Sequence, residues 1–274
     1  MRQMRQDTRR LITRGASLFL AALAGHSGGA RAQEDAAATP APVPFAVGES
    51  LTYKASFGRL HAGTARMAVD GIEVVRGRPA YHVVFTLDGG IPFLRVRDRY
   101  ESWIDVETLA SLRHRQVIAE GRYKRTTTYE IYPERVAYRR DADSLEASVK
   151  NPLDDASFLY AVRAAAVQVG ETRREDRYFR PDRNPVLLSG VRRDTVKVPA
   201  GSFPSVVVAP SIKAKGIFGE GGSALVWFSD DARRYPVRVE SRFAGIGITL
   251  VLQSVTPGEP ATAATIASAA AAMP

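Results

Sequence analysis

Between residues 45 and 256, most of the chain consists of short segments in which apolar and polar residues alternate with a period of two. This alternation is typical of β-strands with one buried face, since successive side chains of a strand point to opposite sides of the sheet. Turn-forming residues separate the segments, for example at Gly58 to Gly63, Arg76 to Pro79 and Pro199 to Ser202. The pattern predicts a mainly β fold, either a curved antiparallel sheet or a partly closed barrel, rather than a parallel βαβ arrangement.

One segment breaks this alternation and has the spacing of a helix. Asp154 and Asp155 stand where capping and the helix dipole favour acidic residues. The apolar residues after them recur at helical intervals, at Phe158, Val162, Ala166 and Val169. The sequence therefore predicts one main α-helix, over about residues 154–168.

The two flanks of this region differ from it in composition. Residues 33–44 are rich in Ala and Pro without apolar periodicity, which predicts a linker. Residues 257–274 are dominated by Ala and show no apolar face to bury, which predicts a disordered tail. We therefore expect a single β-rich domain over 45–256. The chain has no cysteine, so this domain must be stabilised by its hydrophobic core.

The first 32 residues have the three parts of a secretory signal peptide. A basic region comes first, an apolar stretch follows at 16–24, and small residues lead to Ala30-Arg31-Ala32. The apolar stretch is shorter than the roughly 20 residues that a membrane-spanning helix needs. This arrangement predicts cleavage between Ala32 and Gln33.

The predicted cleavage point also bears on the destination of the chain. No cysteine follows it, so a lipoprotein anchor is not expected, and no other apolar run is long enough to cross a membrane. We expect a periplasmic or secreted protein without a transmembrane segment in the mature chain. The general secretory route is expected; the twin-arginine route stays open because Thr8-Arg9-Arg10-Leu11-Ile12 resembles its signal.

The net charge of the whole chain is +9, from 38 basic and 29 acidic residues. Residues 1–32 contain six arginines and one aspartate, so the mature chain keeps 32 basic and 28 acidic residues, a net charge of +4. More than half of the net positive charge, +5 of +9, is thus expected to leave with the signal peptide. Nucleic acid is therefore not a predicted partner.

The sequence offers no motif for nucleophilic or metal-dependent catalysis. It lacks G-x-S-x-G, H-E-x-x-H and S-x-x-K, so no catalytic residue is predicted. His61, His82 and His114 have no spacing typical of a metal site, and we expect three separate surface or rim histidines. No metal or other cofactor is predicted.

Carboxylates are the remaining candidates for acid–base chemistry. Asp98 and Asp105 lie on either side of Trp103, and a pair held at the right separation could hydrolyse a glycan. Asp98 stands between two arginines, which favours an ion-pair role instead. Asp230 and Asp231 are expected to cap a turn through their side-chain oxygens.

Arginines alternate along two predicted strands and would therefore share a face on each. If the strands are neighbours, they form a cationic sheet surface with aromatic residues beside it, and guanidinium groups suit phosphate or carboxylate partners. The alternative is a solvated face balanced by Glu101, Glu130 and Glu134. The predicted ligand-binding residues of this surface are Arg95, Arg97, Arg99, Tyr100, Trp103, Arg113 and Arg115.

A glycine-rich loop at 216–222 carries the apolar residues Ile217 and Phe218. Loops of this kind can gate a cavity or touch a membrane or a partner, so both residues are further binding candidates. No Lys-Ser/Thr follows the glycines, which excludes a phosphate-binding loop.

A set of short segments stands in a fixed order along the chain: Gly48-Glu49-Ser50-Leu51-Thr52-Tyr53, Ala62-Gly63, and the stretches 96–105, 152–160, 197–203 and 227–237. Together they resemble the bacterial exported family known as domain of unknown function 3108, over about residues 45–255. The resemblance implies an exported, mostly β protein. It implies no known reaction, so no catalytic residues are carried over from it.

The sequence thus favours an exported, non-enzymatic β-sheet domain. We expect a concave sheet face, with the helix packed against it, that binds an apolar or anionic envelope ligand (lipid or glycan) or a protein partner. The alternatives are a carboxylate-dependent hydrolase of cell-envelope material, using Asp98 and Asp105, and a purely structural role. Arginine-paired carboxylates would favour binding, and two unpaired carboxylates facing each other in a cleft would favour the hydrolase.

Overall fold

The computed structural model describes residues 41–58, 60–91, 94–212, 222–243 and 246–271. The predicted signal peptide, its cleavage site at Ala32 and Gln33, and the loop residues Ile217 and Phe218 lie outside the described residues.

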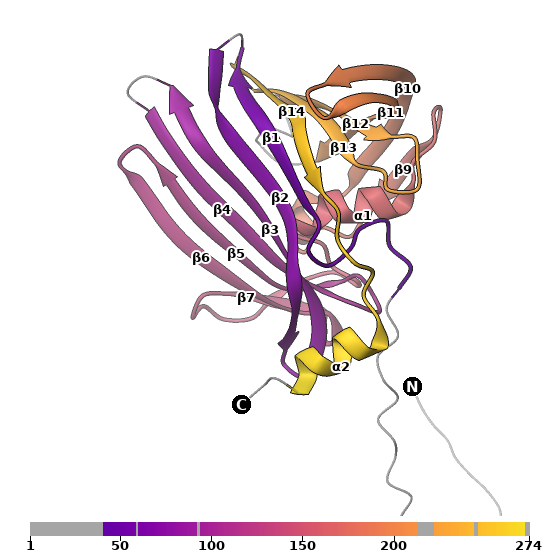
Figure 1. Ribbon diagram of the computed structural model, residues 1–274. Coiled ribbons are helices and arrows are strands. Elements are labelled where there is room, and N and C mark those ends of the chain that lie inside the picture. The colour runs from indigo at the N-terminus through magenta and orange to yellow at the C-terminus, as the bar shows by residue number, and fades with distance from the viewer. Residues whose placement is uncertain (1–40, 59, 92–93, 213–221, 244–245, 272–274) are drawn as a thin grey trace, which may run out of the picture. The chain divides into compact units, whose positions relative to one another are not determined.

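A single antiparallel sheet of fourteen strands dominates the described part of the chain (Figure 1). Its spatial order is β8-β7-β6-β5-β4-β3-β2-β1-β14-β13-β12-β11-β10-β9, so nearly all neighbours in sequence are neighbours in space. This confirms the predicted curved antiparallel sheet. The strands are β1 (Ser50–Phe57), β2 (Leu60–Val75), β3 (Arg78–Ile91), β4 (Leu94–Asp105), β5 (Ser111–Glu120), β6 (Tyr123–Tyr132), β7 (Ala137–Arg140), β8 (Glu146–Ala147), β9 (Thr172–Glu175), β10 (Val186–Val198), β11 (Gly201–Ile212), β12 (Gly222–Ser229), β13 (Pro236–Phe243) and β14 (Ile246–Thr256).

The helical elements are fewer and short. They are α1 (Ser157–Ala165), α2 (Ala263–Ala271) and the 3₁₀ turns η1 (Pro133–Arg135) and η2 (Pro181–Arg183). Neither α-helix of the described region has the length and apolar character needed to cross a membrane.

Helix α1 lies within the curve of the sheet, against one face that we call the inner face (Figure 1). Tyr160 of α1 belongs to the same apolar core as side chains from many strands. Buried side chains of the sheet in that core include Leu51, Tyr53, Ala65, Val69, Tyr81, Val83 and Leu252.

The sheet ends in two short edge strands, β8 with two residues and β9 with four. Short edges expose few unpaired backbone groups, which limits edge-to-edge aggregation. The strands near the two ends are joined by side chains instead: Phe179 packs edge-on against Tyr129 and Tyr138, with ring centroids 5.0 and 5.1 Å away. The same apolar cluster continues through Val162 of α1 to Leu188 of β10.

Helix α1 is shorter than the predicted segment 154–168. Residues before Ser157 form a turn, in which the Asp154 carboxylate accepts hydrogen bonds from the backbone N–H groups of Ala156 and Ser157, at 2.9 Å each. Asp154 therefore closes the turn that precedes the helix, whereas α1 itself begins after Ala156 without a side-chain cap. The helix ends at Ala165, three residues before the predicted end at 168, and Ala166 after it has left-handed backbone angles (φ 51°, ψ 55°).

The C-terminal residues differ from the predicted disordered tail. Backbone hydrogen bonds pair Val47 with Glu259 at 2.9 and 2.8 Å, and α2 follows. Thr262 caps α2 by accepting the N–H of Thr265 at 3.1 Å. Ile266 gives this alanine-rich helix an apolar residue to bury. The Ile266 side chain packs in the main core, and the residue is only 4% exposed.

Candidate functional site around helix α1

A fully buried ion pair lies at the side chain of Arg163, in the last turn of α1. The guanidinium contacts Glu49 through both carboxylate oxygens, at 2.7 and 3.2 Å, and the two side chains are 0% and 2% exposed. Arg163 also donates to the carbonyl oxygens of Pro44, at 3.1 Å, and Arg233, at 3.0 Å. It therefore connects α1 to the segment before β1 and to the turn after β12.

Aromatic rings surround the same guanidinium. Its central carbon lies 5.8, 5.7 and 5.5 Å from the ring centroids of Phe45, Tyr160 and Tyr235. Such distances allow cation–π attraction, which is strongest away from water. Burial also raises the pKa of the Tyr160 hydroxyl, so this ring stays neutral. We call Arg163, Glu49 and these rings the arginine cluster.

A second buried charge cluster lies before α1. His114 of β5 is 0% exposed; its Nδ1 donates to the carbonyl of Glu101 at 2.8 Å and lies 3.5 Å from Asp154. Its Nε2 lies 3.5 Å from Asp155. Burial alone lowers the pKa of His114, but the two carboxylates outweigh burial and raise this pKa to about 9. The imidazole is thus charged at neutral pH.

Hydroxyl groups complete this histidine cluster. Ser102 of β4 donates to Asp154 at 2.5 Å, and Tyr178 donates to Asp155 at 2.6 Å. Arg183 in turn donates to the Tyr178 hydroxyl at 2.8 Å. The cluster therefore joins β4 and β5, the turn before α1, and the segment that leads to β10.

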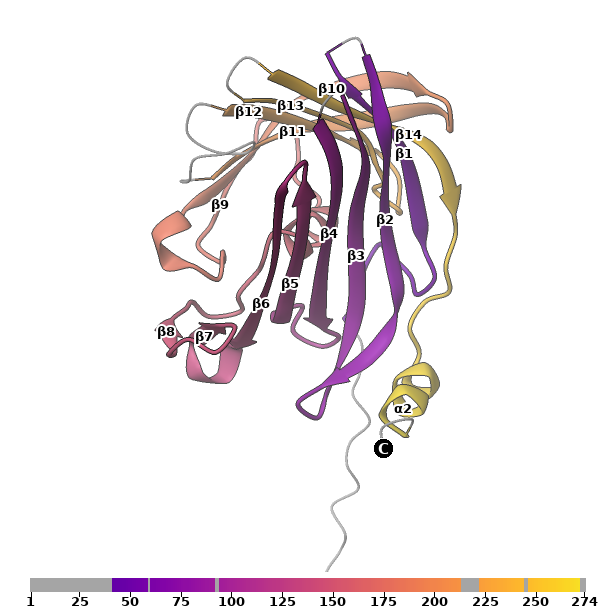
Figure 2. The same cartoon turned by 90° about the vertical axis from the view of Figure 1, so that its left-hand side faces the viewer.

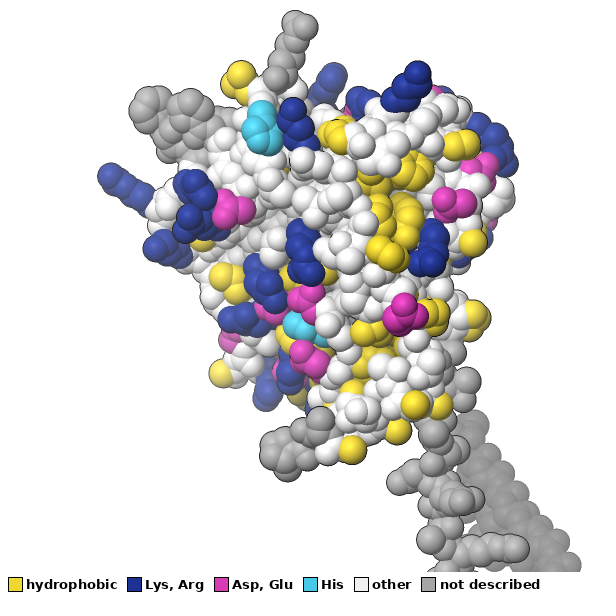
Figure 3. All heavy atoms as spheres, in the orientation of Figure 1, with side chains coloured by type: hydrophobic (Ala, Val, Ile, Leu, Met, Phe, Trp, Pro, Cys, Tyr) yellow, Lys and Arg dark blue, Asp and Glu magenta, His cyan; other side chains and the backbone are white. Residues whose placement is uncertain are grey.

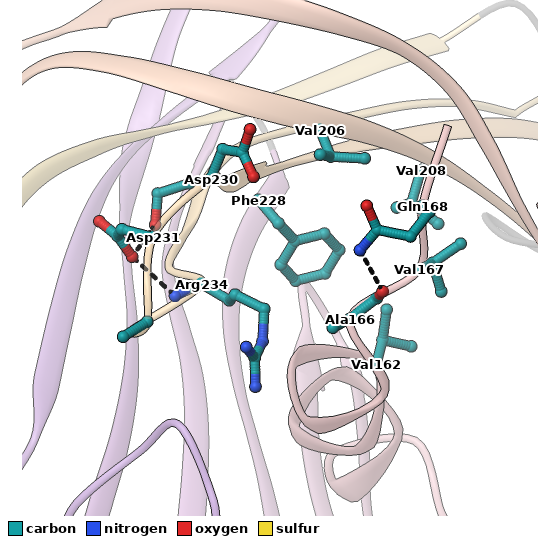
Figure 4. A pocket seen from close by; sticks show the side chains of 12 residues that line it. Val162, Ala166, Val167, Gln168, Val206, Val208, Phe228, Asp230, Asp231 and Arg234 are labelled. Carbon is teal, nitrogen blue, oxygen red and sulfur yellow. Dashed lines mark hydrogen bonds between the residues drawn. The ribbon is translucent and has the colours of Figure 1, made fainter. Parts of the chain in front are cut away.

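A cleft of about 260 Å³ opens between α1 and the inner side of β11 and β12 (Figure 4). Aliphatic and aromatic side chains form its floor and polar ones its rim. The floor residues include Val162, Val167, Val206, Val208 and Phe228, and the rim residues Gln168, Asp230, Asp231 and Arg234.

Arg234 is the rim residue with unused donors. Asp230 forms an ion pair with Arg193, and Asp231 accepts the backbone N–H groups of Arg233 and Arg234 at 2.9 Å each. Arg234 Nε donates to the Arg163 carbonyl. Within the described part of the chain, its two terminal Nη atoms have no hydrogen-bond or ion-pair partner.

A second cleft of about 280 Å³ lies on another side of α1, and Val162 lines both. Leu109, Leu153 and Phe158 contribute apolar walls. Its arginines have partners within the protein. Arg173 donates to the carbonyl of Ala165 at 3.0 Å and Arg177 to that of Asn151 at 2.7 Å.

The predicted cationic surface exists on the outer face, because β4 and β5 are neighbours. Its arginines are balanced by carboxylates: Arg95 and Arg97 lie 2.6 and 3.6 Å from Asp88, Arg99 and Arg115 lie 2.9 and 2.8 Å from Glu101, and Arg113 lies 2.6 Å from Glu130. The geometry therefore resembles the alternative of a balanced, solvated face, with Asp88 in place of Glu134.

The aromatic residues predicted beside this surface are separated by the sheet. Trp103 lies on the outer face but is only 7% exposed, since His82 stacks on it at 4.5 Å and Arg113 lies 5.4 Å from its ring centroid. Tyr100 lies on the inner face, near Phe85. His82 and His114 are buried, which differs from the predicted surface or rim positions, because each stacks on an aromatic ring between strands.

Asp98 and Asp105 cannot form a catalytic pair across one cleft. They are seven positions apart on one regular strand and so point to opposite faces. Asp105 contacts Arg78 at 2.8 Å and accepts the N–H of Thr108 at 2.8 Å. Asp98 accepts the N–H of Ala119 at 3.0 Å.

The predicted ion pair of Asp98 is absent from the described region, because Arg97 and Arg99 point to the other face. Among the residues placed by the structure, no three His, Asp or Glu side chains are grouped so as to hold a metal ion.

Sequence reasoning missed both buried clusters, although it named His114, Asp154 and Asp155 in other roles. Arg163 had a usable signal, a charge three residues after Tyr160 on the buried side of the helix. His114 and Glu49 had none, because their partners lie 40 and 114 residues away in sequence. Several of the motif segments meet at α1: Glu49 lies in the first, Ser102 in 96–105, Asp154 in 152–160, and Arg234 in 227–237.

Comparison with known proteins gives a family but no activity. The family model described as "Protein of unknown function (DUF3108)" matches residues 52–253. No curated protein matches the chain. A solved β-barrel-like protein of domain of unknown function DUF1849 from Brucella abortus is similar, with 9% identity, 80% of this chain and 100% of that chain covered, and a TM-score of 0.49. The hypothetical protein CT021 from Chlamydia trachomatis has 9% identity, 79% and 92% coverage and a TM-score of 0.36.

Proposed function

Because the chain belongs to the DUF3108 family, whose function is unknown, its role must come from its own geometry, and we propose that it is an exported, non-enzymatic binding protein of the cell envelope. Its ligand is an anionic amphiphile. The apolar end of the ligand enters the cleft between α1, β11 and β12, and its anionic group meets Arg234 at the rim.

The observation that carries this proposal is the unpaired end of Arg234 beside an apolar floor (Figure 4). Binding sites for small molecules combine an apolar lining with a few placed polar groups. Guanidinium groups suit carboxylate and phosphate, which they contact through two parallel hydrogen bonds. The other rim charges, Asp230 and Asp231, are already used within the protein.

The size of the cleft limits what enters it. Pockets that bury a whole drug-sized ligand measure about 300–1,000 Å³. The cleft, at about 260 Å³, suits only one end of a longer molecule, such as a short acyl chain. The two buried clusters fix α1 on the sheet, which supports a preformed cleft.

Export rests on the sequence of residues 1–32, which has the parts of a signal peptide. Cell fractionation tests it: we expect a shortened chain in the periplasm or the medium. A product of precursor size found only in the cytosol would contradict the proposed compartment.

Ligand binding is tested with decanoate as the probe, by isothermal titration of the purified chain. We expect the Arg234→Gln variant to bind decanoate at least tenfold more weakly, since a charged hydrogen bond is lost. Arg233→Gln is the matched control, because this neighbouring arginine is exposed and its side chain does not line the cleft. Equal affinity in Arg234→Gln and the unchanged chain, or no binding of decanoate at all, would exclude this site.

A further inference from the structure

One end of the sheet gathers several of its hairpin connections. The antiparallel register pairs Phe57 with Leu60 at the β1–β2 turn, and Glu120 with Tyr123 at the β5–β6 turn. The first residues of β4 and the last of β3 lie at the same end, as Ile91 pairs with Leu94. The β13–β14 turn joins them, because Ile248 of β14 pairs with Phe57. We call this the hairpin end of the sheet; Figures 1 and 2 show it at the top.

The hairpin end carries a surplus of exposed positive charge. Its exposed cations are Arg95, Arg97, Arg122, Lys124, Arg125 and Arg242. Its exposed acids among the described residues are Asp88 and Glu120, and Arg95 and Arg97 share the first of these. In the part of the chain that the structure describes, Arg122, Lys124 and Arg242 have no carboxylate within ion-pair distance. Figure 3 shows Lys and Arg side chains gathered at the left, over the ends of β4 to β6.

Two large apolar side chains are exposed at the same end. Leu60, the first residue of β2, is 63% exposed, and Tyr123, the first residue of β6, is 53% exposed. A single exposed leucine needs no explanation. Here both side chains stand at hairpin tips of the same end, and Tyr123 lies between the unpaired cations Arg122 and Lys124.

We propose that the hairpin end docks the protein on an anionic lipid bilayer. Unpaired Lys and Arg are attracted to anionic headgroups, and the attraction decays within a Debye length. Leu and Tyr at the tips then enter the boundary between headgroups and acyl chains, the position that tyrosine favours in membrane proteins. A soluble polyanion would match the charges but would leave Leu60 and Tyr123 exposed. The inference is independent of the proposed ligand cleft.

A single-cysteine reporter tests docking on the full chain, which has no native cysteine. Tyr123→Cys is labelled with an environment-sensitive fluorophore, and Glu134→Cys, a 52%-exposed position in the η1 turn, is the matched control. With phosphatidylglycerol vesicles at low salt we expect a blue shift at position 123 and none at 134. Phosphatidylcholine vesicles or 1 M salt should abolish the shift. No shift at 123, or an equal shift at both positions, would overturn the proposal.

Charge reversal separates bilayer docking from general polyanion binding. Arg122→Glu with Arg125→Glu in the labelled chain should weaken vesicle binding at least tenfold, whereas Arg135→Glu in η1 should leave it unchanged. All variants share the same N-terminal segment, so a difference between them reports the hairpin end. Equal losses in both variants, or a blue shift at 123 produced by a soluble polyphosphate without vesicles, would refute docking on lipid.

Discussion

The arginine cluster and the histidine cluster both fix α1 to the sheet, but with different chemistry. Arg163 meets one carboxylate with two hydrogen bonds from its planar guanidinium. His114 carries a charge that titrates, and its charge depends on two carboxylates at 3.5 Å. The attachment of the helix through His114 should therefore depend on pH.

The difference also separates what each cluster holds together. The arginine cluster connects the end of α1 with the start of β1 and the turn that forms the cleft rim. The histidine cluster connects the start of α1 with β4, β5 and Tyr178, and so helps to join the two ends of the open sheet. Buried charges often stabilise little overall, yet removing one partner is costly because the other stays buried and unpaired.

The largest effect on stability is expected when one charge of the Arg163–Glu49 ion pair is removed and the other is kept. Glu49→Gln leaves the guanidinium of Arg163 buried without its counter-charge, which should lower the free energy of unfolding by about 3–5 kcal/mol. Urea denaturation measures this. The double variant Glu49→Leu with Arg163→Met removes both charges and should recover a large part of the loss. A double variant as unstable as Glu49→Gln would show that the charge is not the cause.

The next effect is a pH dependence that His114 gives to the histidine cluster. The pKa of His114 is raised to about 9 in the folded chain, from the ordinary value near 6.5. The protonated imidazole thus adds stability that is fully present below about pH 6.5 and is lost as pH rises through 9. Linkage puts the contribution at roughly 2–4 kcal/mol. Urea denaturation between pH 6 and pH 10 should show the decline in the unchanged chain and little of it in His114→Gln, and an equal decline in both would assign it elsewhere.

A smaller effect is expected at the outer part of the histidine cluster. Tyr178→Phe removes the hydroxyl that donates to Asp155 while the ring keeps its packing against Phe179. Loss of one hydrogen bond to a charged group should cost about 1.5–3 kcal/mol. Ser205→Ala is a useful comparison, since among the described residues this buried hydroxyl bonds only to the nearby backbone carbonyl of Phe203. If Tyr178→Phe lowers the free energy of unfolding no more than Ser205→Ala does, Asp155 does not belong to the cluster.

The fold was predictable because alternation and turn residues are local properties. The period of two revealed the strands, and the acidic residues before Phe158 revealed the one break in the pattern. The number of positions between two residues of one strand also shows whether they share a face, and the sequence reasoning did not use this for the proposed carboxylate pair. Asp98 and Asp105 are an odd number of positions apart, so one face could never hold both.

The candidate site was not predictable, since it depends on contacts between distant segments. Glu49 and Arg163 are 114 residues apart, and only the curl of the sheet brings them together. The arginines of β4 and β5 share a face, and the carboxylates that pair with them come partly from β3 and β6. Alternation along a strand shows on which face of the sheet a side chain lies. Which side chains lie beside it on that face depends on the order of the strands in the sheet.

The smallest effect is expected at a charge pair outside both clusters. Arg140 contacts Asp143 at 2.7 Å, as closely as Arg163 contacts Glu49, but its side chain is 45% exposed. Water screens such a pair, and holding two long side chains in place costs entropy. Arg140→Ala should leave the urea midpoint unchanged within error and should not alter the decline in stability above pH 6.5. A shift as large as that of Glu49→Gln would mean that distance, rather than burial, decides what a charge pair contributes in this sheet.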